Sequence, residues 1–482
     1  MMKIQGQMLI DGCWVNSVNG EVLEVVNPAT EEIMGSVPKA GSIDVEAAID
    51  AANNAFSAWA SKSPMQRGEL LRKASELVFE RSSQIAALMT EEQGKPFLEA
   101  QGEVKKGAEI LRYYAEEGER VYGRIIANAD TDIESRVVYQ PIGPAAAISP
   151  WNYPVELLAW KVGGALAAGC TIVAKLPSET PLSPLAFLKC LVDAGIPAGV
   201  VNGITGPGSV IGRILTQSPK IKKIAFTGST EVGRQVLANS IDTFKKVSLE
   251  LGGSLPMIVC NDCDLDAAVA GAVRRSFRNM GQICIAINRI YVDEQVYESF
   301  LEKFAQAISK LTIGNGSLDS YDLGPMCTSG GLKKVKSHIE DALSKGSSLC
   351  CGGKTPVGKC FEKGYYYEPT VLRDVNHSML VMTEETFGPV VGVMPFKSLD
   401  EAINLANDTP YGLAAIVFTE SLSTANRFAK EINAGNIAIN NVDAGVMNAP
   451  YGGWKDSGFG HEHGPEGLYE YLNIKHIRVR YL

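Results

Sequence analysis

Three residues scattered along this sequence have side chains that could act together on a carbonyl group. Cys284 lies in FRNMGQICIAINR (residues 277–289), Glu250 in LELGGS and Asn152 in SPWNYP. A thiol can add to a carbonyl carbon, a carboxylate can act as a base, and an amide can donate to an oxyanion. Each residue also has an ordinary structural interpretation. A free cysteine is usually buried, and Glu before two glycines or Asn before Tyr-Pro is common in caps and turns.

The sequence around Cys284 favours a short connector. The preceding segment, DCDLDAAVAGAVRRSF, starts at a capping-type Asp and predicts a helix that Gly281 should end. The following segment, RIYVDE, alternates like a strand. A connector between two regular elements can hold a side chain in place and still expose it. The local sequence alone leaves both interpretations of Cys284 open.

Strand and helix signals alternate from residue 143 to residue 253. Five apolar segments separated by helical ones predict an α/β fold, a doubly wound parallel sheet of the kind that binds nucleotides. These segments are GPAAAIS, CTIVAKL, VVNGITG, KIAFTG and KVSLELGG. Ligands of such sheets bind outside the carboxyl ends of the strands, where Asn152 and Glu250 fall.

Two glycine-containing turns follow strands of this predicted sheet. One runs from Gly206 through Gly208 to Gly212, and the other from Gly228 to Gly233. Such a turn at a helix N-terminus lets backbone N–H groups approach a pyrophosphate. Neither turn matches G-x-G-x-x-G, and either could be a plain turn.

A second alternation, from residue 284 to residue 450, predicts a second α/β domain. ESRVVYQPI (134–142) and the C-terminal NIKHIRVRYL (473–482) fit neither domain, and both alternate like edge strands. We expect these two segments to pair between subunits. The predicted organisation is a dinucleotide-binding domain of residues 1–118 and 143–252, a catalytic domain of residues 253–450, and a small β oligomerisation arm of residues 119–142 and 466–482.

The composition argues against several classes of function. The net charge of −9 argues against a nucleic-acid partner, because phosphate binding needs a basic surface. No signal peptide is evident, and the longest charge-free apolar run, residues 162–174, is too short to span a bilayer. The ten irregularly spaced cysteines indicate reduced thiols, so we expect a cytoplasmic protein without membrane contact. No metal site is predicted: Cys260 and Cys263 lack companion ligands, and His461 and His463 resemble a surface loop.

Seven motifs together resemble the NAD(P)-dependent aldehyde dehydrogenase superfamily, in the family's order and over nearly the whole chain. Some of them look closest to its succinate-semialdehyde dehydrogenases. The motifs are SPWNYP (149–154), AKLPSETP (174–181), FTGSTEVG (226–233), LELGG (249–253), GQICIAINR (281–289), EETFGPVV (384–391) and PYGGWKDSG (450–458).

The resemblance implies a role for each matching residue. Cys284 would be the catalytic thiol, Glu250 the base that activates the deacylating water, and Asn152 the oxyanion donor. An aldehyde would be oxidised to the carboxylic acid through a thiohemiacetal and a thioester, with hydride transfer to NAD(P). The expected cofactor-binding residues are Ser149, Trp151, Lys175, Ser178, Gly208, Gly228, Ser229, Gly233, Glu385 and Phe387.

Three positions suggest how this chain is specialised. Ser178 stands where many NAD-preferring members carry Glu, so we expect use of NADP or of both cofactors. Of the two arginines with which succinate-semialdehyde dehydrogenases commonly hold the substrate carboxylate, Arg278 is kept and Trp160 replaces the other. The expected substrate is therefore a small polar or anionic aldehyde, and the expected assembly a homodimer or homotetramer.

Three alternatives remain open on the sequence. A CoA-acylating relative would generally lack the deacylating carboxylate, so Glu250 argues against it. A catalytically silent dinucleotide-binding protein of the same fold would not need Asn152, Glu250 and Cys284 together. A hydroxyaldehyde such as lactaldehyde or glycolaldehyde would use the same chemistry, and the sequence does not exclude it.

Overall fold

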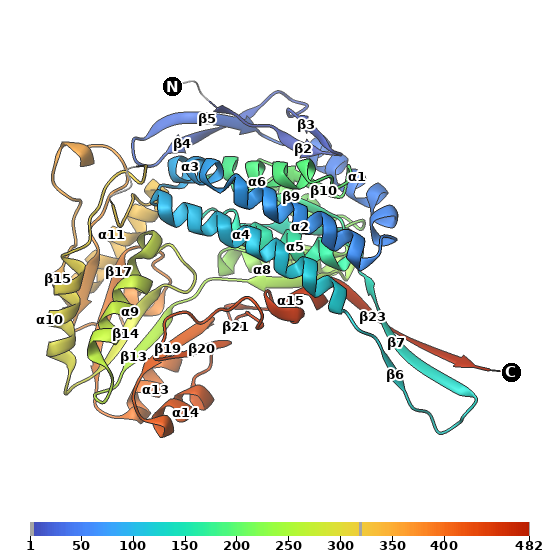
Figure 1. Cartoon of the computed structure of the whole chain (residues 1–482). Coiled ribbons are helices and arrows are strands. Elements are labelled where there is room, and N and C mark those ends of the chain that lie inside the picture. The colour runs from blue at the N-terminus through green and yellow to red at the C-terminus, as the bar shows by residue number, and fades with distance from the viewer. Residues whose placement is uncertain (1–3, 318–320, 482) are drawn as a thin grey trace.

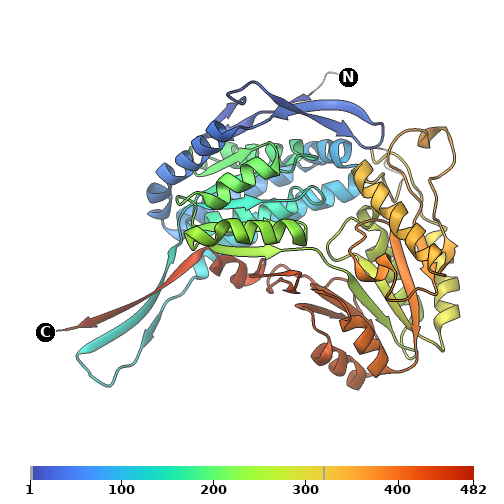
Figure 2. The same cartoon turned by 180° about the vertical axis from the view of Figure 1, so that it is seen from behind.

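The computed structural model of the chain describes residues 4–317 and 321–481. The outermost residues of the predicted ranges, 1–3 and 482, lie outside the described residues, as do residues 318–320 within the predicted catalytic domain. Two large sheets with their helices form the body, and a narrow three-stranded sheet projects from it (Figures 1 and 2). Among the described residues, no helix combines the length and the apolar character needed to cross a membrane.

The first large sheet contains the five strands predicted between residues 143 and 253, and these five run parallel to one another. The chain adds β9 and β10 on one side of β8, then returns to add β11 and β12 on its other side. The switch point between β8 and β11 is where a doubly wound sheet opens a ligand crevice. In spatial order the strands are β22 (Gly458–Phe459), β12 (Lys246–Glu250), β11 (Lys223–Thr227), β8 (Ala145–Ile148), β9 (Ile172–Lys175), β10 (Val201–Ile204), β2 (Met8–Ile10) and β3 (Cys13–Val15).

Helices cover both faces of this sheet because its strands are apolar on both sides. In β8, Ala145 and Ala147 pack with one core, and Ala146 and Ile148 with another. The first core includes residues of α2 (Pro64–Glu80), α3 (Ser82–Gln93), α4 (Phe97–Glu117), α5 (Glu156–Ala168) and α6 (Leu182–Asp193). The second includes residues of α1 (Ser42–Ala60), α7 (Gly208–Gln217) and α8 (Thr230–Ser240).

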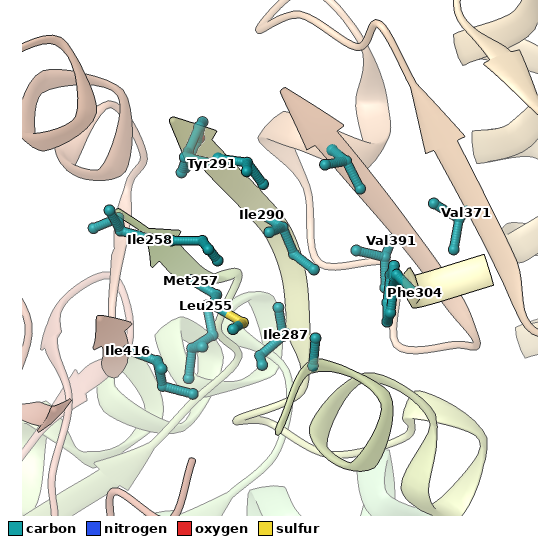
Figure 3. Close-up of a cluster of buried hydrophobic side chains, with 14 of the residues drawn as sticks. Leu255, Met257, Ile258, Ile287, Ile290, Tyr291, Phe304, Val371, Val391 and Ile416 are labelled. Atoms are coloured by element: carbon teal, nitrogen blue, oxygen red, sulfur yellow. The ribbon is translucent and has the colours of Figure 1, made fainter. Parts of the chain in front are cut away.

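The second large sheet confirms the predicted second α/β unit. Its strands are parallel except β15 at one edge, and apolar side chains fill the space around them (Figure 3). In spatial order they are β15 (Ser348–Cys351), β16 (Thr370–Arg373), β17 (Val390–Phe396), β14 (Ile287–Asp293), β13 (Leu255–Val259), β19 (Ala414–Phe418) and β20 (Asn436–Ile439). Its helices are α9 (Leu265–Phe277), α10 (Tyr297–Ile308), α11 (Ser329–Ser344), α12 (Leu380–Thr383), α13 (Leu399–Asn407) and α14 (Leu422–Glu431).

The projecting sheet corrects the predicted pairing of the two alternating segments. β7 (Ile133–Pro141) and β23 (Leu472–Arg480) pair antiparallel with each other within one chain, over nine residues each, and do not need a second subunit to do so. β6 (Arg124–Ile126) pairs with the other edge of β7. Alternation along a strand shows which side chains share a face, but it does not reveal which strand lies alongside. The remaining small elements are β1 (Ile4–Gln5), β4 (Val22–Asn27), β5 (Glu32–Pro38), β18 (Tyr411–Gly412), β21 (Trp454–Lys455) and α15 (Gly464–Tyr469).

Candidate active site

Two cavities open onto the same cysteine. The helix-side cavity, of about 370 Å³, lies beside α4, α5 and α9, and the strand-end cavity, of about 410 Å³, lies at the carboxyl ends of β8, β9 and β11. Cys284 and Asn152 line both of them. Glu250, Trp160 and Arg278 line the helix-side cavity. The fold therefore brings the three candidate catalytic side chains, from segments far apart in the sequence, to one place.

Cys284 lies on the connector between α9 and β14, as predicted. The helix ends at Phe277, the last residue of the predicted helical segment, and Asn279 and Met280 adopt left-handed φ angles of 49° and 57° before Gly281 at 67°. The thiol is partly exposed, and its Sγ lies 3.7 Å from the hydroxyl of Tyr451. Burial raises the pKa of the Cys284 thiol to about 12. The free protein therefore holds this sulfur mainly as a thiol, which must lose its proton to a nearby base before it can attack.

Hydrogen bonds of its backbone carbonyl and of its side chain hold Asn152 beside the Cys284 connector. Its carbonyl oxygen accepts hydrogen bonds from Lys95 Nζ at 2.7 Å and from Asn279 Nδ2 at 3.1 Å. The Asn152 Nδ2 donates to the carbonyl of Gln282 at 3.0 Å. Lys95 is itself fully buried and forms an ion pair of 2.5 Å with Glu103. An amide nitrogen carries two hydrogens, so one remains for an oxyanion next to the sulfur.

Glu250 ends β12 and is buried, and neither of its carboxylate oxygens has a hydrogen-bond partner among the described residues. Burial raises the pKa of the Glu250 carboxyl well above its usual range, and the nearby Glu462 adds to this effect while Lys161 opposes it. Lys161 is buried and donates to Glu462 Oε1 and to Thr227 Oγ1, both at 2.6 Å. A desolvated carboxyl without hydrogen bonds is a stronger base than a solvated one, which suits proton abstraction from water.

Most of the predicted cofactor residues line the strand-end cavity. A side chain at Gly228 would collide with the ring of Phe226, since its Cβ would lie 2.5 Å from the ring, and the next residue, Ser229, caps α8 through a bond from Val232 N. Bare backbone at the start of a helix is a good site for a pyrophosphate. The predicted residues in the lining are Ser149, Trp151, Lys175, Gly208, Gly228, Ser229, Glu385 and Phe387.

Residues of the second sheet's unit also line the strand-end cavity. Glu385 accepts a hydrogen bond from Gly253 N at 3.1 Å, and burial raises the pKa of its carboxyl to about 7. Phe387 meets Trp151 edge to face, with ring centroids 5.5 Å apart. The cavity is therefore bounded on one side by β8 to β11 and on the other by the EETF segment.

Two predicted cofactor residues do not line the cavity. The Ser178 hydroxyl donates to the carbonyl of Gly206 at 3.2 Å, and it is the neighbouring Glu179 that lines the cavity. Gly233 is buried on α8, where a Cβ would lie 2.5 Å from Leu251 Cδ2, so this glycine allows the helix to pack closely on the segment after β12. The motif predicted a turn that lines the cavity, but it did not distinguish residues that face the cavity from residues that face the core.

A stack of three rings lines the helix-side cavity. Trp160 lies 3.6 Å from the ring of His463, and His463 stacks in turn on Tyr451 at 5.0 Å. The interpretation of this histidine as part of a surface loop is therefore wrong. His463 has a left-handed φ of 58°, and burial lowers the pKa of its imidazole to about 3, so the ring is neutral. In the part of the chain that the structure describes, no cluster of His, Cys, Asp or Glu could hold a metal ion.

Comparison with known proteins decides the family. The model of the aldehyde dehydrogenase family matches residues 14–477. The chain belongs to the aldehyde dehydrogenase family. This assignment confirms the resemblance seen in the seven motifs.

Several members of the aldehyde dehydrogenase family are similar to the chain over nearly its full length. It is 45% identical over 473 residues to a succinate-semialdehyde dehydrogenase (NADP(+)) of Escherichia coli (strain K12), which covers 98% of this chain and 97% of that protein. It is 42% identical over 475 residues to a 3-sulfolactaldehyde dehydrogenase of Pseudomonas putida, with the same coverage. The crystal structure of succinate-semialdehyde dehydrogenase from Burkholderia pseudomallei superposes with a TM-score of 0.97 at 43% identity, covering 99% of this chain and 98% of that one.

The structure of this aldehyde dehydrogenase adds residues that the sequence analysis did not name. Lys161 carried a signal, because it is the single charged residue between positions 157 and 168 of an apolar helix. The others lie in ordinary polar surroundings in the sequence, and only the fold brings them to the site. They are Lys95, Glu103, Arg275, Tyr451 and Glu462.

Proposed function

We propose that the chain oxidises a small anionic aldehyde to the carboxylic acid with NAD(P) as hydride acceptor. The observation that carries this proposal is that the two cavities meet at Cys284, so that a substrate in one and a cofactor in the other would both reach the same sulfur. Asn152 lines both cavities, and Glu250 lines the helix-side cavity.

The first half of the reaction forms a thioester on Cys284. Its thiolate adds to the aldehyde carbon, and the free hydrogen of Asn152 Nδ2 stabilises the oxyanion that develops. A bound NAD(P) would supply the acceptor for the hydride that leaves as the carbonyl re-forms. The bare backbone at Gly228 and the start of α8 fit its pyrophosphate, and Glu385 and Phe387 would lie at its nicotinamide end.

The second half hydrolyses the thioester. Glu250 in its carboxylate form takes a proton from water, and the hydroxide attacks the acyl carbon and displaces the Cys284 thiolate. The product is the carboxylic acid. Lys161 and Glu462, which form an ion pair, act on Glu250 in opposite directions. Lys161 favours the carboxylate form of Glu250, and Glu462 disfavours it.

The substrate class follows from the helix-side cavity and the relatives. Three basic residues, Lys106, Arg275 and Arg278, line the cavity, and the Trp160 ring limits its size. Relatives named for succinate semialdehyde and 3-sulfolactaldehyde support an aldehyde that carries a carboxylate or a sulfonate.

A panel of aldehydes with both cofactors tests this function. We expect kcat/KM for succinate semialdehyde to exceed that for pentanal, a neutral aldehyde of similar length, by at least about 10-fold, because a charge-assisted hydrogen bond contributes about 1.5–3 kcal/mol. Glycolaldehyde and lactaldehyde are the comparison for the hydroxyaldehyde alternative. A preference for these or for pentanal would refute the anionic class while leaving the oxidation chemistry in place.

Cofactor choice should depend on Glu179. Its carboxylate lines the strand-end cavity and acts electrostatically on Lys175, so it would disfavour a 2′-phosphate that Lys175 attracts. We expect NADP or dual use in the wild type. Glu179→Gln should shift the ratio of kcat/KM for NADP over NAD upward by about 5- to 10-fold, the size of a partly screened charge effect.

The matched control for this experiment is Glu231→Gln. Glu231 is an exposed carboxylate in the first turn of α8, and it does not line the cavity. Its removal should leave the cofactor ratio unchanged within about twofold, as expected for an exposed, screened charge. Equal shifts in the two variants would show that this electrostatic argument is wrong, and strict NAD preference in the wild type would refute the expected use of NADP.

We further propose the assembly, compartment and domains of the protein. The arm of β6, β7 and β23 supports a homodimer or homotetramer, because its outer strands have unpaired edges with Ile125 and Ile474 exposed. The ten free cysteines support a reducing cytoplasm. The division into a dinucleotide-binding domain around the first sheet and a catalytic domain around the second is supported by their separate cores.

A further inference from the structure

The three basic residues of the helix-side cavity differ in the exposure of their side chains and in their acidic partners. Arg278 has a 37% exposed side chain, and its Nε donates to Glu99 at 3.1 Å. Lys106 is 38% exposed and bonds to Glu109 on the same helix. Arg275 has a side chain only 7% exposed. An exposed cation that already has a carboxylate partner gains little from a second anion, because water and salt screen it.

Arg275 has a positive charge that is only partly neutralised, and it has a hydrogen-bond donor without a partner among the described residues. It contacts Asp443, but the same carboxylate also binds Arg274, so two guanidinium groups share one negative charge. The Nε of Arg275 is buried and has no hydrogen-bond partner among the described residues. A buried guanidinium with a spare N–H would gain strongly from an anionic ligand.

Arg275 also lies in the cavity that contains the proposed reaction centre. It lines the same cavity as Cys284, and its charge opposes the burial that raises the pKa of the thiol. It sits in the last turn of α9, the helix that leads into the Cys284 connector, so its position relative to the sulfur is set by one continuous segment.

We propose that Arg275 is the residue that binds the anionic group of the substrate, with Asp443 orienting its guanidinium. This proposal rests on the proposed function, because it names the group that recognises the anionic end of the aldehyde. Arg278, at the more exposed position, would attract the anion toward the cavity without holding it in the bound state. Arg275 is then a specificity-determining residue, since its partner is the anion and not the carbonyl.

Steady-state kinetics of Arg275→Ala and Arg275→Lys test the proposal. In Arg275→Ala, kcat/KM for succinate semialdehyde should fall about 10- to 100-fold through KM, while kcat/KM for pentanal should change less than about threefold. Arg275→Lys, which keeps the charge but loses the planar fork, should recover part of the loss. Unimpaired oxidation of pentanal shows that the variants are folded.

Arg274→Ala is the matched control. Arg274 binds the same Asp443, but its side chain is 53% exposed and it does not line the cavity. Arg274→Ala should leave kcat/KM for both aldehydes within about twofold of the wild-type values, as is usual for exposed ion pairs. Two results would overturn the assignment. One is an equal loss of kcat/KM for both aldehydes in Arg275→Ala. The other is a loss confined to succinate semialdehyde in Arg278→Ala but not in Arg275→Ala.

Alkylation of Cys284 tests the same site without turnover. Iodoacetate and iodoacetamide have nearly the same size and differ in charge, so the ratio of their rates reports on anion binding next to the sulfur. Arg275→Ala should lower the ratio of iodoacetate to iodoacetamide rates about 3- to 10-fold, and Arg274→Ala should not, because only the first removes a buried charge near the thiol. An unchanged ratio in Arg275→Ala refutes the role of Arg275. A lowered ratio in an enzyme that does not prefer anionic aldehydes supports the anion site and refutes the proposed substrate class.

Discussion

Cys284→Ala should reduce aldehyde oxidation at least about 10⁴-fold, the scale on which loss of a nucleophile acts in covalent catalysis. No other cysteine lines either cavity, so none can replace it. The measurement is NAD(P)H formation by purified protein with succinate semialdehyde, together with cofactor binding followed by fluorescence. Binding of the cofactor should persist, because Cys284 is only one of many residues that line the strand-end cavity.

Cys350→Ala is the control for the loss of a thiol. Cys350 lies on the edge strand β15, away from both cavities, and is partly exposed like Cys284. It should keep wild-type activity. If Cys284→Ala retained more than about 1% of the wild-type rate, the thioester mechanism would be refuted. The catalytically silent alternative predicts that wild-type protein forms no NAD(P)H with any aldehyde.

Glu250→Gln should separate the two halves of the reaction. The thioester still forms, so each active site should release one equivalent of NAD(P)H in a burst. The steady-state rate that follows should fall about 10²- to 10⁴-fold, the usual contribution of a general base. Rapid mixing with absorbance detection measures the burst, and the mass of the quenched protein should show the acyl group on Cys284.

The pH dependence gives a second test of Glu250. Because the pKa of its carboxyl is raised well above the usual range, the carboxylate form is lost as pH falls through that higher pKa. The steady-state rate of the wild type should therefore rise with pH above the range in which an ordinary glutamate titrates. Glu250→Gln should lose this dependence, apart from what the Cys284 thiol contributes.

The same variant addresses the CoA-acylating alternative. With CoA added, the wild type should release free acid and no acyl-CoA, because Glu250 activates water next to the thioester. If acyl-CoA were the main wild-type product and Glu250→Gln had no effect on its formation, deacylation by water would be excluded as the main route.

The regular elements around the site were largely predictable. The five strands of the first sheet are each four or five residues long and almost wholly buried, so they appear as apolar runs between helical segments. β13, which the sequence analysis did not name, follows β12 after only four residues. The helix before Cys284 was predicted to its last residue, but the left-handed backbone of Asn279 and Met280 after it was not, since these residues leave no signal of the kind that glycine does.

The sequence by itself determined the fold class and singled out the cysteine, the carboxylate and the amide as candidates, because buried periodicity and the family's motifs lie in local stretches of the chain. Only the tertiary structure decided that β7 pairs with β23 in the same chain, that Glu179 and not Ser178 faces the cavity, and that His463 stacks on Trp160. It also decided that Arg275, with a donor that has no partner among the described residues, lines the same cavity as Cys284. The physical reason is that each of these facts depends either on a neighbour that is remote in sequence or on which side of a turn a side chain faces. Side-chain periodicity specifies neither of these.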